Sequence, residues 1–433
     1  MKTRIAFIST SILLVTLFLF TSCSHDINSP IEKRFQEVLD ERISKYYDEN
    51  DVRGVSAAVI LPDQNIWTGV SGISHDTVSI KPDMLFAIGS ITKTFVATLT
   101  LKFVEEGVLS LDDPLSKWLP AYPHIDSTIT IRQLLNHTSG IYMFWSNQQI
   151  WDDLKKDRTR VWTPEEVLSY IKEPYSTPGE GFRYSNTNYL LLAMIIEKAT
   201  GSKLSTEFNK SFWEPLDIDN AYLSIEEDIP SNQAHVFGDN FNNDGSNLDL
   251  TFLPRASHES ITYGSSGLFM TAEDLARWCH ALFEGEVLHQ QLMDEMLNFV
   301  DVDIGFGPSK RGYGLGVILF KGRLSNGERA IGHSGGNIGT SVYMVYLPEH
   351  HFTIVVMMND FNDEYSQAIT KDLIAKALKE YNVIGIIPYF DFFPYGFLLI
   401  GVSTILLVLI IRYMRRKLRA NKRYANKNSS QLL

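Results

Sequence analysis

Phe86-Ala-Ile-Gly-Ser-Ile-Thr-Lys93 runs directly into the apolar segment Thr94–Glu106, and this stretch predicts the start of a buried helix. Ser90 lies in the first turn and Lys93 follows one turn later, so both side chains share a helix face. Backbone N–H groups and the positive end of the helix dipole would stabilise an oxyanion formed beside the serine. An amine held away from water has a lowered pKa and can take a proton from a hydroxyl. The stretch therefore contains the smallest set of groups that a serine acyl-transfer site needs.

The spacing alone does not establish that chemistry, because an ordinary helix start can carry the same two residues. A second pair with this spacing, Ser169 and Lys172, lies late in a short helix that opens at Thr163 with a capping box. There we expect both side chains to be solvated, and we assign them no role. Other parts of the chain must decide what Ser90 and Lys93 do.

Composition limits the class of protein. The chain has 433 residues, of which 44% are hydrophobic and 12% aromatic, enough for one large domain with a sizeable core. The net charge is −12, and residues 1–23 together with the tail from Arg412 carry ten basic residues and no acidic one, which leaves −22 on residues 24–411. So acidic a body is not expected to bind nucleic acid.

The two cysteines, Cys23 and Cys279, leave no intrachain disulfide if Cys23 belongs to a processing site. Cys279 is predicted to be a small core residue on a helix. No Cys/His cluster has the spacing of metal ligands, so we expect no metal and no other cofactor.

The N-terminus has the pattern of a lipoprotein-type signal segment over residues 1–23. Lys2 and Arg4 precede the uncharged run Ile5–Phe20, and Cys23 at the junction resembles a bacterial lipobox. Lipid would then be attached to Cys23, although Phe20 stands where that pattern usually has leucine. An uncleaved membrane helix is the alternative. Residues 24–30 form a short polar tether.

The C-terminus carries the pattern of a membrane helix. Residues 392–411 are twenty residues without a charge, and basic residues follow from Arg412. By the positive-inside rule, residues 412–433 form a cytoplasmic tail and the body lies on the extracytoplasmic side, periplasmic or at the cell surface. A buried core helix is the alternative. We therefore expect a cell-membrane protein in contact with lipid.

The elements of the body suggest an α+β fold. Hydrophobic patterns predict strands at both ends of the chain and helices in the middle, with residues 202–260 as a polar excursion that either rims a site or is plain surface. This order indicates an antiparallel sheet built from N- and C-terminal parts, with a helical lobe beside it, within residues 31–385. The expected strands are 55–61, 66–70, 313–320, 328–332, 341–347 and 352–358. The expected helices are 31–47, 94–106, 130–136, 188–199, 271–283 and 364–380.

Two further clusters supply groups that a serine–lysine pair needs. Tyr184 lies on a loop just before an apolar helix and could relay protons to a leaving group, while the Asn186 amide could bind lysine or a substrate carbonyl. His333-Ser-Gly-Gly336 lies at a strand end, where small residues admit a substrate backbone and the Gly336 N–H could be a second oxyanion donor. Taken singly, these residues would be ordinary turn residues or a bulge.

Five motifs occur in an order that resembles the serine beta-lactamase-related family. That family includes class C beta-lactamases, low-molecular-weight penicillin-binding D-Ala-D-Ala carboxypeptidases, D-aminopeptidases and esterases, and the resemblance spans roughly residues 31–381. It implies a beta-lactamase/transpeptidase-like fold. The motifs are Gly89-Ser-Ile-Thr-Lys93, Leu134-Leu-Asn-His-Thr-Ser-Gly140, Tyr184-Ser-Asn186, Gly264-Ser-Ser-Gly267 and Gly332-His-Ser-Gly-Gly336.

The resemblance also implies roles for individual residues. Ser90 would be the acylated nucleophile, Lys93 the partner base, Tyr184 the proton relay and Asn186 a ligand of lysine and of the substrate amide. His333, Ser334 and Gly335 would form the strand triad, with the N–H groups of Ser90 and Gly336 as the oxyanion hole. Whether Lys93 or a Tyr184 phenolate removes the proton stays open.

His333 is where the sequence departs from class C beta-lactamases, which carry a permanently charged lysine there. Histidine is mostly neutral at pH 7 and resembles the carboxypeptidase and esterase branches. We therefore expect a membrane-anchored serine hydrolase acting on a D-amino-acid peptide or ester. A class C-like beta-lactamase is the first alternative, and a non-enzymatic sensor of beta-lactams or wall fragments is the second.

Overall fold

The computed structural model describes residues 30–50, 53–239, 246–303, 310–320, 322 and 324–384. The signal segment with Cys23, most of the tether, the predicted membrane helix 392–411 and the basic tail lie outside these residues. Among the residues described, no helix has both the length and the apolar character needed to span a bilayer. The chain divides into a unit of residues 1–376, which contains the sheet and the site, and a second unit, Ala377–Leu433, of which only the end of one helix is described.

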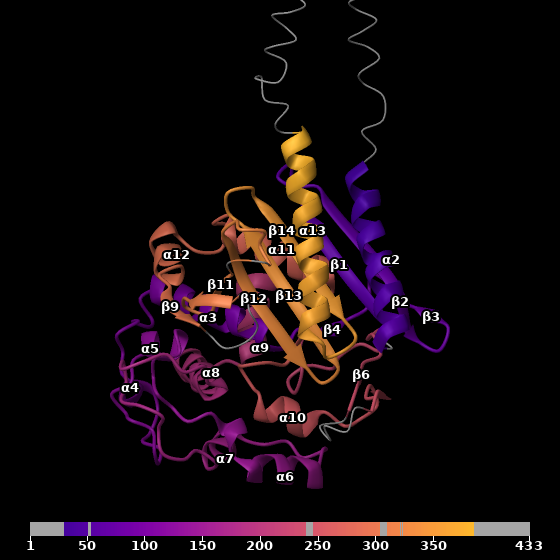
Figure 1. Cartoon of the computed structure of the whole chain (residues 1–433). Helices are drawn as coiled ribbons and strands as arrows, with labels where there is room; N and C mark the ends of the chain where they lie inside the picture. The colour runs from indigo at the N-terminus through magenta and orange to yellow at the C-terminus, as the bar shows by residue number, and fades with distance from the viewer. Residues whose placement is uncertain are drawn as a thin grey trace, which may run out of the picture. The chain divides into compact units, whose positions relative to one another are not determined.

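Nine of the strands described in the first unit form one large antiparallel sheet in the order β3-β2-β1-β14-β13-β12-β11-β10-β9 (Figure 1). Val55 of β1 pairs with Met358 of β14, so strands from the N- and C-terminal parts of the body are neighbours inside the sheet, as the sequence predicted. The bounds are β1 Gly54–Ile60, β2 Ile66–His75, β3 Val78–Ser79, β9 Val300–Asp303, β10 Lys310–Tyr313, β11 Ile318–Phe320, β12 Ala330–Asn337, β13 Thr340–Leu347 and β14 Phe352–Met358.

Helices cover both faces of this sheet, which explains why β1, β13 and β14 are buried along their whole length. On one face lie α2 (Pro30–Asn50) and α13 (Asp363–Ile384), where the Tyr343 hydroxyl donates to Asp363 at 3.0 Å. On the other lies α11 (Ala272–Phe283), whose Phe283 ring is 5.4 Å from that of Tyr346. Tyr343 and Tyr346 are three residues apart on β13 and therefore point to opposite faces. Figure 1 shows α2 and α13 in front of the sheet and α11 behind it.

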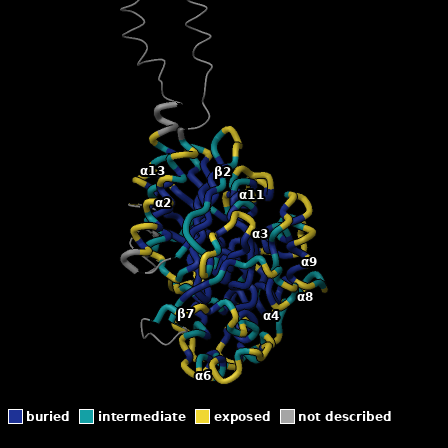
Figure 2. Tube along the Cα trace, turned by 90° about the vertical axis from the view of Figure 1, so that its right-hand side faces the viewer, coloured by how far each residue is buried: buried dark blue, intermediate teal, exposed yellow. Residues whose placement is uncertain are grey.

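The helical lobe is built around α3 and α8, which are buried over most of their length (dark blue in Figure 2). Phe95 of α3 stacks on Trp278 of α11 with 3.7 Å between ring centres, which joins the lobe to the sheet layer. The bounds are α3 Thr92–Glu105, α4 Leu115–Trp118, α5 Ile131–Leu135, α6 Gln148–Lys156, α7 Pro164–Leu168, α8 Asn186–Thr200, α9 Leu204–Phe208, α10 Ala256–Ile261 and α12 Gln290–Met296, with helical turns η1 Gly89–Ile91, η2 Phe144–Ser146 and η3 Asn209–Trp213.

A small sheet anchors the segment that leads to Ser90. Its order is β4-β8-β5, with β4 at Phe86–Ala87, β5 at Ala221–Leu223 and β8 at Leu268–Met270. The Ile88 N–H donates to the Leu268 carbonyl at 2.9 Å, and the Thr340 hydroxyl donates to the Ala87 carbonyl at 2.8 Å. A further pair, β6 Phe237–Gly238 and β7 Leu248–Asp249, forms a short hairpin. Three distant parts of the chain therefore converge just before the nucleophile.

Three expected strands differ from those found. The strand expected at 66–70 continues as β2 to His75. Residues 313–320 do not form one strand, because Gly316 has a φ of +78° and the chain turns there between β10 and β11. The expected strand 328–332 instead continues as β12 through His333 and both glycines to Asn337.

Candidate active site

Ser90 and Lys93 meet as the sequence predicted, although the serine lies in the short turn η1 rather than in α3 itself. Gly89 has a φ of +55°, a backbone conformation that favours glycine, and α3 begins at Thr92. The Lys93 Nζ donates to Ser90 Oγ at 3.0 Å and to the Ser265 carbonyl oxygen at 2.8 Å. Lys93 is fully buried, and this desolvation lowers the pKa of its amine well below the ordinary value.

Tyr184 is the third polar group of the site, after Ser90 and Lys93. It lies two residues before α8, and its hydroxyl is hydrogen-bonded to that of Ser90. The Lys93 Nζ is 5.0 Å from the centre of the Tyr184 ring. Burial raises the pKa of the phenol, and the hydrogen bond from Ser90 only partly offsets this. Amine, hydroxyl and phenol are thus brought together from α3, η1 and the entry to α8.

His137, from the second motif, fixes the backbone beside Tyr184. Its Nδ1 accepts from the Ser185 N–H at 3.2 Å and lies 3.0 Å from Asn188 Nδ2, so the proton of the neutral ring is on Nε2. The rings of His137 and Tyr184 are 4.3 Å apart. Burial, followed by the charges of Lys93 and His333, lowers the pKa of His137 well below its ordinary value. A neutral histidine therefore supports the position of Tyr184.

His333 lies on β12, buried and 2% exposed. Its Nδ1 is 2.6 Å from its neighbour's carbonyl oxygen, that of Ser334, and because a carbonyl only accepts, Nδ1 carries the proton. Its Nε2 can then accept from the Tyr313 hydroxyl, 3.0 Å away. The Tyr313 ring also lies 6.0 Å from that of Tyr184, so the histidine belongs to the same aromatic cluster as the relay tyrosine.

Gly335 and Gly336 of β12 pack directly against the turn that carries Ser90. A Cβ placed on Gly335 would lie 1.9 Å from the Ile88 carbonyl oxygen and 3.1 Å from the Ser90 nitrogen. A Cβ on Gly89 would lie 2.6 Å from the Gly336 nitrogen. Only residues without side chains allow this approach, which puts the Gly336 peptide beside that of Ser90, where two oxyanion donors are needed.

Asn186 does not make the predicted contact with Lys93. Its Oδ1 is buried without a hydrogen-bond partner, and the Ser265 carbonyl accepts from the lysine instead. The structure leaves Asn186 at the first position of α8, where its N–H faces the sulfur of Met143 at 3.0 Å. Ser334, the remaining predicted residue, is buried in β12.

Sequence reasoning assigned no role to Ser265, Tyr313 or His137. Ser265 acts through its carbonyl oxygen, which any residue type would supply. Tyr313 could not be distinguished by sequence from the other aromatic residues of the expected strands. The only signals were the two supporting motifs around His137 and Ser265.

An open cleft of about 870 Å³ adjoins Gly336. Part of its wall comes from the excursion 202–260, which favours the expectation that this region rims the site. The lining residues are Gln148, Trp151, Lys155, Phe237, Gly238, Asp239, Ser246, Asn247, Leu250, His258, Gly336, Asn337, Ile338, Gly339, Asp360, Phe361 and Asn362. In the described part of the chain, no group of three or more His, Cys, Asp or Glu side chains is placed to hold a metal ion.

Together these groups have the arrangement of a serine acyl-transfer site. The Ser90 hydroxyl is hydrogen-bonded to the buried Lys93 amine and to the Tyr184 phenol, and it lies beside Gly335 and Gly336 of β12. Comparison with known proteins identifies the class. Residues 39–379 match the Beta-lactamase family, and the chain belongs to that family.

Similar proteins fall into two groups. A penicillin-binding protein of Bacillus subtilis (strain 168) is 29% identical over 311 residues, which is 67% of this chain and 64% of that protein. A D-stereospecific amidohydrolase from a Streptomyces species superposes with a TM-score of 0.66 at 28% identity, over 77% of this chain and 96% of that one. The D-amino acid amidase of Ochrobactrum anthropi SV3 in complex with D-phenylalanine superposes with a TM-score of 0.70 at 26% identity, over 81% of this chain and 99% of that one.

The chain spans slightly less than two thirds of the length of that penicillin-binding protein, and 59% of the flp protein of Staphylococcus aureus (strain MRSA252), which it also matches. Its family, its fold and the contact between Ser90 and Lys93 are those expected of a serine hydrolase of the beta-lactamase fold.

Proposed function

We propose that the protein hydrolyses a peptide, amide or ester bond of a D-amino-acid substrate through an acyl-enzyme on Ser90. The observation that carries the proposal is the row Lys93–Ser90–Tyr184 beside the Gly336 peptide. The choice of substrate rests on the resemblance to D-amino acid amidases and penicillin-binding proteins and on histidine, rather than lysine, at position 333.

Acylation begins when Ser90 Oγ attacks the substrate carbonyl carbon and its proton passes to the Lys93 amine, 3.0 Å away. The directions of the pKa shifts favour Lys93 as base, because burial lowers the pKa of the amine and raises that of the Tyr184 phenol. The N–H groups of Ser90 and Gly336 would stabilise the developing oxyanion, and loss of one such donor costs about a hundred- to a thousand-fold in rate.

Collapse of the tetrahedral intermediate breaks the bond to the leaving nitrogen or oxygen. That atom takes a proton from the Tyr184 hydroxyl, and Lys93 gives the proton that it took from Ser90 to the resulting phenolate. Water then attacks the ester on Ser90 along the reverse route and releases the acid. Lys93 and Tyr184 end the cycle in the states in which they began.

The test is intact-mass analysis of the purified full-length protein after exposure to D-phenylalanine amide, D-alanyl-D-alanine peptides, short acyl esters and a penicillin. We expect turnover of at least one non-lactam substrate and an adduct mapped to Ser90. Ser90→Ala should remove both while leaving the melting temperature within a few degrees of the wild type. Absence of any adduct and of any Ser90-dependent turnover would remove the proposal.

The same experiment separates the alternatives. Rapid release of penicilloate, faster than hydrolysis of D-peptides or esters, would make the protein a beta-lactamase. A stable adduct with no turnover of any substrate would favour the non-enzymatic sensor. A hydrolase of D-amino-acid substrates stays acylated by penicillin and turns over the other compounds.

We also propose that the protein is anchored in a cell membrane with its catalytic domain outside the cytoplasm. Support comes from the uncharged run 392–411, the basic residues that follow it and the lipobox-like junction at Cys23. Membrane fractionation of cells, followed by protease treatment from the outer side, tests the orientation. Cys23→Ser should abolish labelling by a radioactive fatty acid if the cysteine is lipidated. A body protected from external protease would contradict the topology.

A further inference from the structure

Asn337, which directly follows Gly336, ties the end of β12 to a buried carboxylate. Its Nδ2 donates to Glu259 Oε1 at 3.2 Å and to Ser266 Oγ at 3.3 Å, and its Oδ1 accepts from the Ile338 N–H at 2.6 Å. Both Asn337 and Glu259 are buried, at 6% and 2% exposure. The amide therefore has partners on both sides, and its position fixes the peptide that precedes it.

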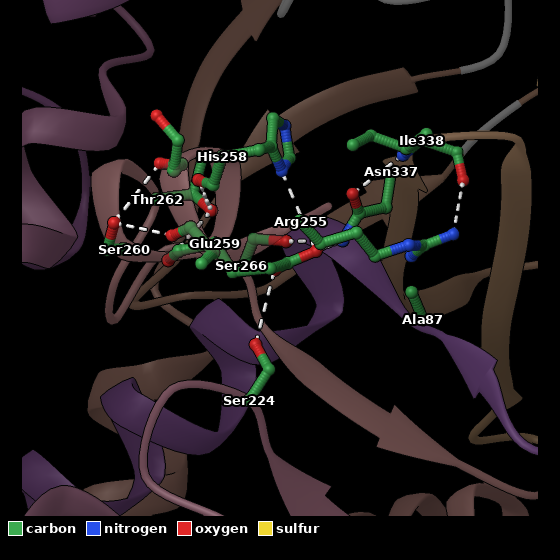
Figure 3. Close-up of polar contacts among 12 residues, drawn as sticks. Ala87, Ser224, Arg255, His258, Glu259, Ser260, Thr262, Ser266, Asn337 and Ile338 are labelled. Atoms are coloured by element: carbon green, nitrogen blue, oxygen red, sulfur yellow. Dashed lines mark hydrogen bonds and ion pairs between the residues drawn. The ribbon is translucent and has the colours of Figure 1, made fainter. Parts of the chain in front are cut away.

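Glu259 is an acceptor for groups from three parts of the chain. Beside Asn337 it accepts from the Ser224 hydroxyl at 3.4 Å, and the Nδ1 of His258 lies 3.6 Å from its Oε1. Figure 3 shows Glu259 of α10 enclosed by Ser224, Ser266 and Asn337. Burial raises the pKa of this carboxyl, but the contact with His258 and the charges of His258 and Arg255 outweigh it and hold the pKa below its ordinary value.

The cluster of Glu259, Asn337 and Ser266 adjoins both the oxyanion donor Gly336 and Ser265, which binds Lys93. Through Asn337 it holds the residue next to the Gly336 N–H. Through the same Asn337 amide, which also donates to Ser266 Oγ, it holds the residue next to Ser265, whose carbonyl accepts from the Lys93 amine at 2.8 Å. The two connections run through neighbouring peptides, so a shift of the Glu259 carboxylate would move an oxyanion donor and the lysine's acceptor together.

A carboxylate suits this place because it only accepts hydrogen bonds, and the groups that face it are donors. Glutamine would present an NH2 group to at least one of those donors and leave a buried polar group unpaired, which shifts or loosens the cluster. Burying a charged group is costly unless it is paired, and Glu259 meets this condition through Asn337, Ser224 and His258.

We propose that Glu259 is a positioning residue for catalysis, which acts through Asn337 and Ser266 to set the Gly336 N–H against Ser90 and the Ser265 carbonyl against Lys93. This inference rests on the proposed acyl-enzyme chemistry, and it assigns Glu259 no contact with substrate.

The test measures acylation rate constants and KM for full-length Glu259→Gln, Asn337→Ala and the double variant. Glu207→Gln is the matched control, since Glu207 is another buried glutamate, 5% exposed, on α9. We expect Glu259→Gln to acylate about ten- to a hundred-fold more slowly, less than the loss of a whole oxyanion donor, with KM changed by less than about threefold. Glu207→Gln should keep the wild-type rate even where its melting temperature falls.

The double variant separates positioning from general destabilisation. If Glu259 acts through Asn337, Glu259→Gln should slow acylation far less in the Asn337→Ala background than in the wild type. Independent, additive losses, or a rate in Glu259→Gln equal to that of the wild type or of Glu207→Gln, would overturn the positioning role alone. A wild-type protein that forms no adduct overturns the proposed function and this inference with it. Should Glu259→Gln not fold, Asn337→Ala against Ser224→Ala gives the same comparison, because Ser224 contacts Glu259 without touching β12.

Discussion

Lys93 is a residue whose proposed catalytic role opposes stability. The amine is fully buried, and its folded-state pKa lies well below the 10.5 of an exposed lysine. Between those two pKa values the unfolded chain holds a proton that the folded protein lacks, so the free energy of unfolding rises with pH there, by about 1.4 kcal/mol per pH unit. The stabilisation is complete above pH 10.5 and is lost as the pH falls toward the folded pKa.

We therefore predict that Lys93→Met abolishes acylation and makes the protein more stable than the wild type at pH 7. The methionine fills a similar volume and needs no proton removed on folding. The stability difference should shrink as the pH is raised toward 10, because the wild type alone gains. Urea unfolding of both proteins at pH 7, 8.5 and 10 measures it. A difference that stays constant or widens over this range would show that the amine is not held with a lowered pKa.

Tyr184 should matter most where the leaving group needs a proton. We predict that Tyr184→Phe lowers kcat/KM for an amide by about a hundred- to ten-thousand-fold, and for a p-nitrophenyl ester by much less, since nitrophenolate leaves without protonation. The comparison of the two substrates in one variant cancels errors in protein concentration. Tyr175→Phe is the control, because Tyr175 is an exposed tyrosine with its own hydrogen bond to Ser146. Equal losses for amide and ester would argue that Tyr184 is not the proton relay.

The residues predicted from sequence are those whose side chains have a chemical role in the proposed function. Ser90, Lys93 and Tyr184 have characteristic groups in motifs, and the structure brings them into hydrogen-bond contact. Ser265 could not be found this way because its contribution is a backbone carbonyl. For Asn186 the motif is present in the sequence, but Lys93 donates to the Ser265 carbonyl and not to the Asn186 side chain. Which of these two acceptors the lysine uses depends on distances in the folded protein, and the spacing of the motifs does not determine them.

At the scale of elements, β12 shows how one strand carries both packing and catalysis. It pairs with β13 residue by residue, Gly335 opposite Val342 and Gly336 opposite Ser341, and Gly335 also packs against the turn of Ser90. Its glycines have low strand propensity, so the sequence predicted an end near Gly332, and only the pairing with β13 carries the strand on to Asn337.

We predict that Gly335→Ala loses acylation and about 1–3 kcal/mol of stability, because its Cβ would lie 1.9 Å from the Ile88 carbonyl oxygen and must push η1 away from β12. Gly181→Ala is the matched control, since nothing lies within 4 Å of its added Cβ. Thermal melting and the acylation rate of both variants give the measurement. Wild-type activity in Gly335→Ala would mean that the approach of β12 to Ser90 is not required.

The whole molecule places its site where distant segments meet. β1 and β14 lie side by side at the centre of the sheet, and β4 and β8 join the nucleophile's segment to the turn that holds Lys93. Strands at both chain ends were enough to predict the antiparallel sheet. The small sheet β4-β8-β5 was not predicted, because its members have only two or three residues and no measurable period.

The net charge of the molecule affects which substrates approach the site most readily. Residues 24–411 carry −22, and the charged residues of the cleft wall include Asp239 and Asp360 against Lys155. Such a field repels an approaching carboxylate and attracts an ammonium group. A D-amino acid amide, which is cationic, should therefore meet the site more readily than a substrate with a free carboxylate.

We predict that ionic strength separates three kinds of substrate. Raising salt from about 0.01 M to about 0.1 M shortens the Debye length from about 30 Å to about 10 Å, which removes most long-range repulsion and attraction. The second-order acylation rate should then rise for an anionic penicillin, stay level for a neutral ester and fall for D-phenylalanine amide. The neutral ester controls for direct effects of salt on the chemistry. A rate for penicillin that falls with salt would instead reveal a local cationic site strong enough to outweigh the negative body, and would restore the beta-lactamase alternative.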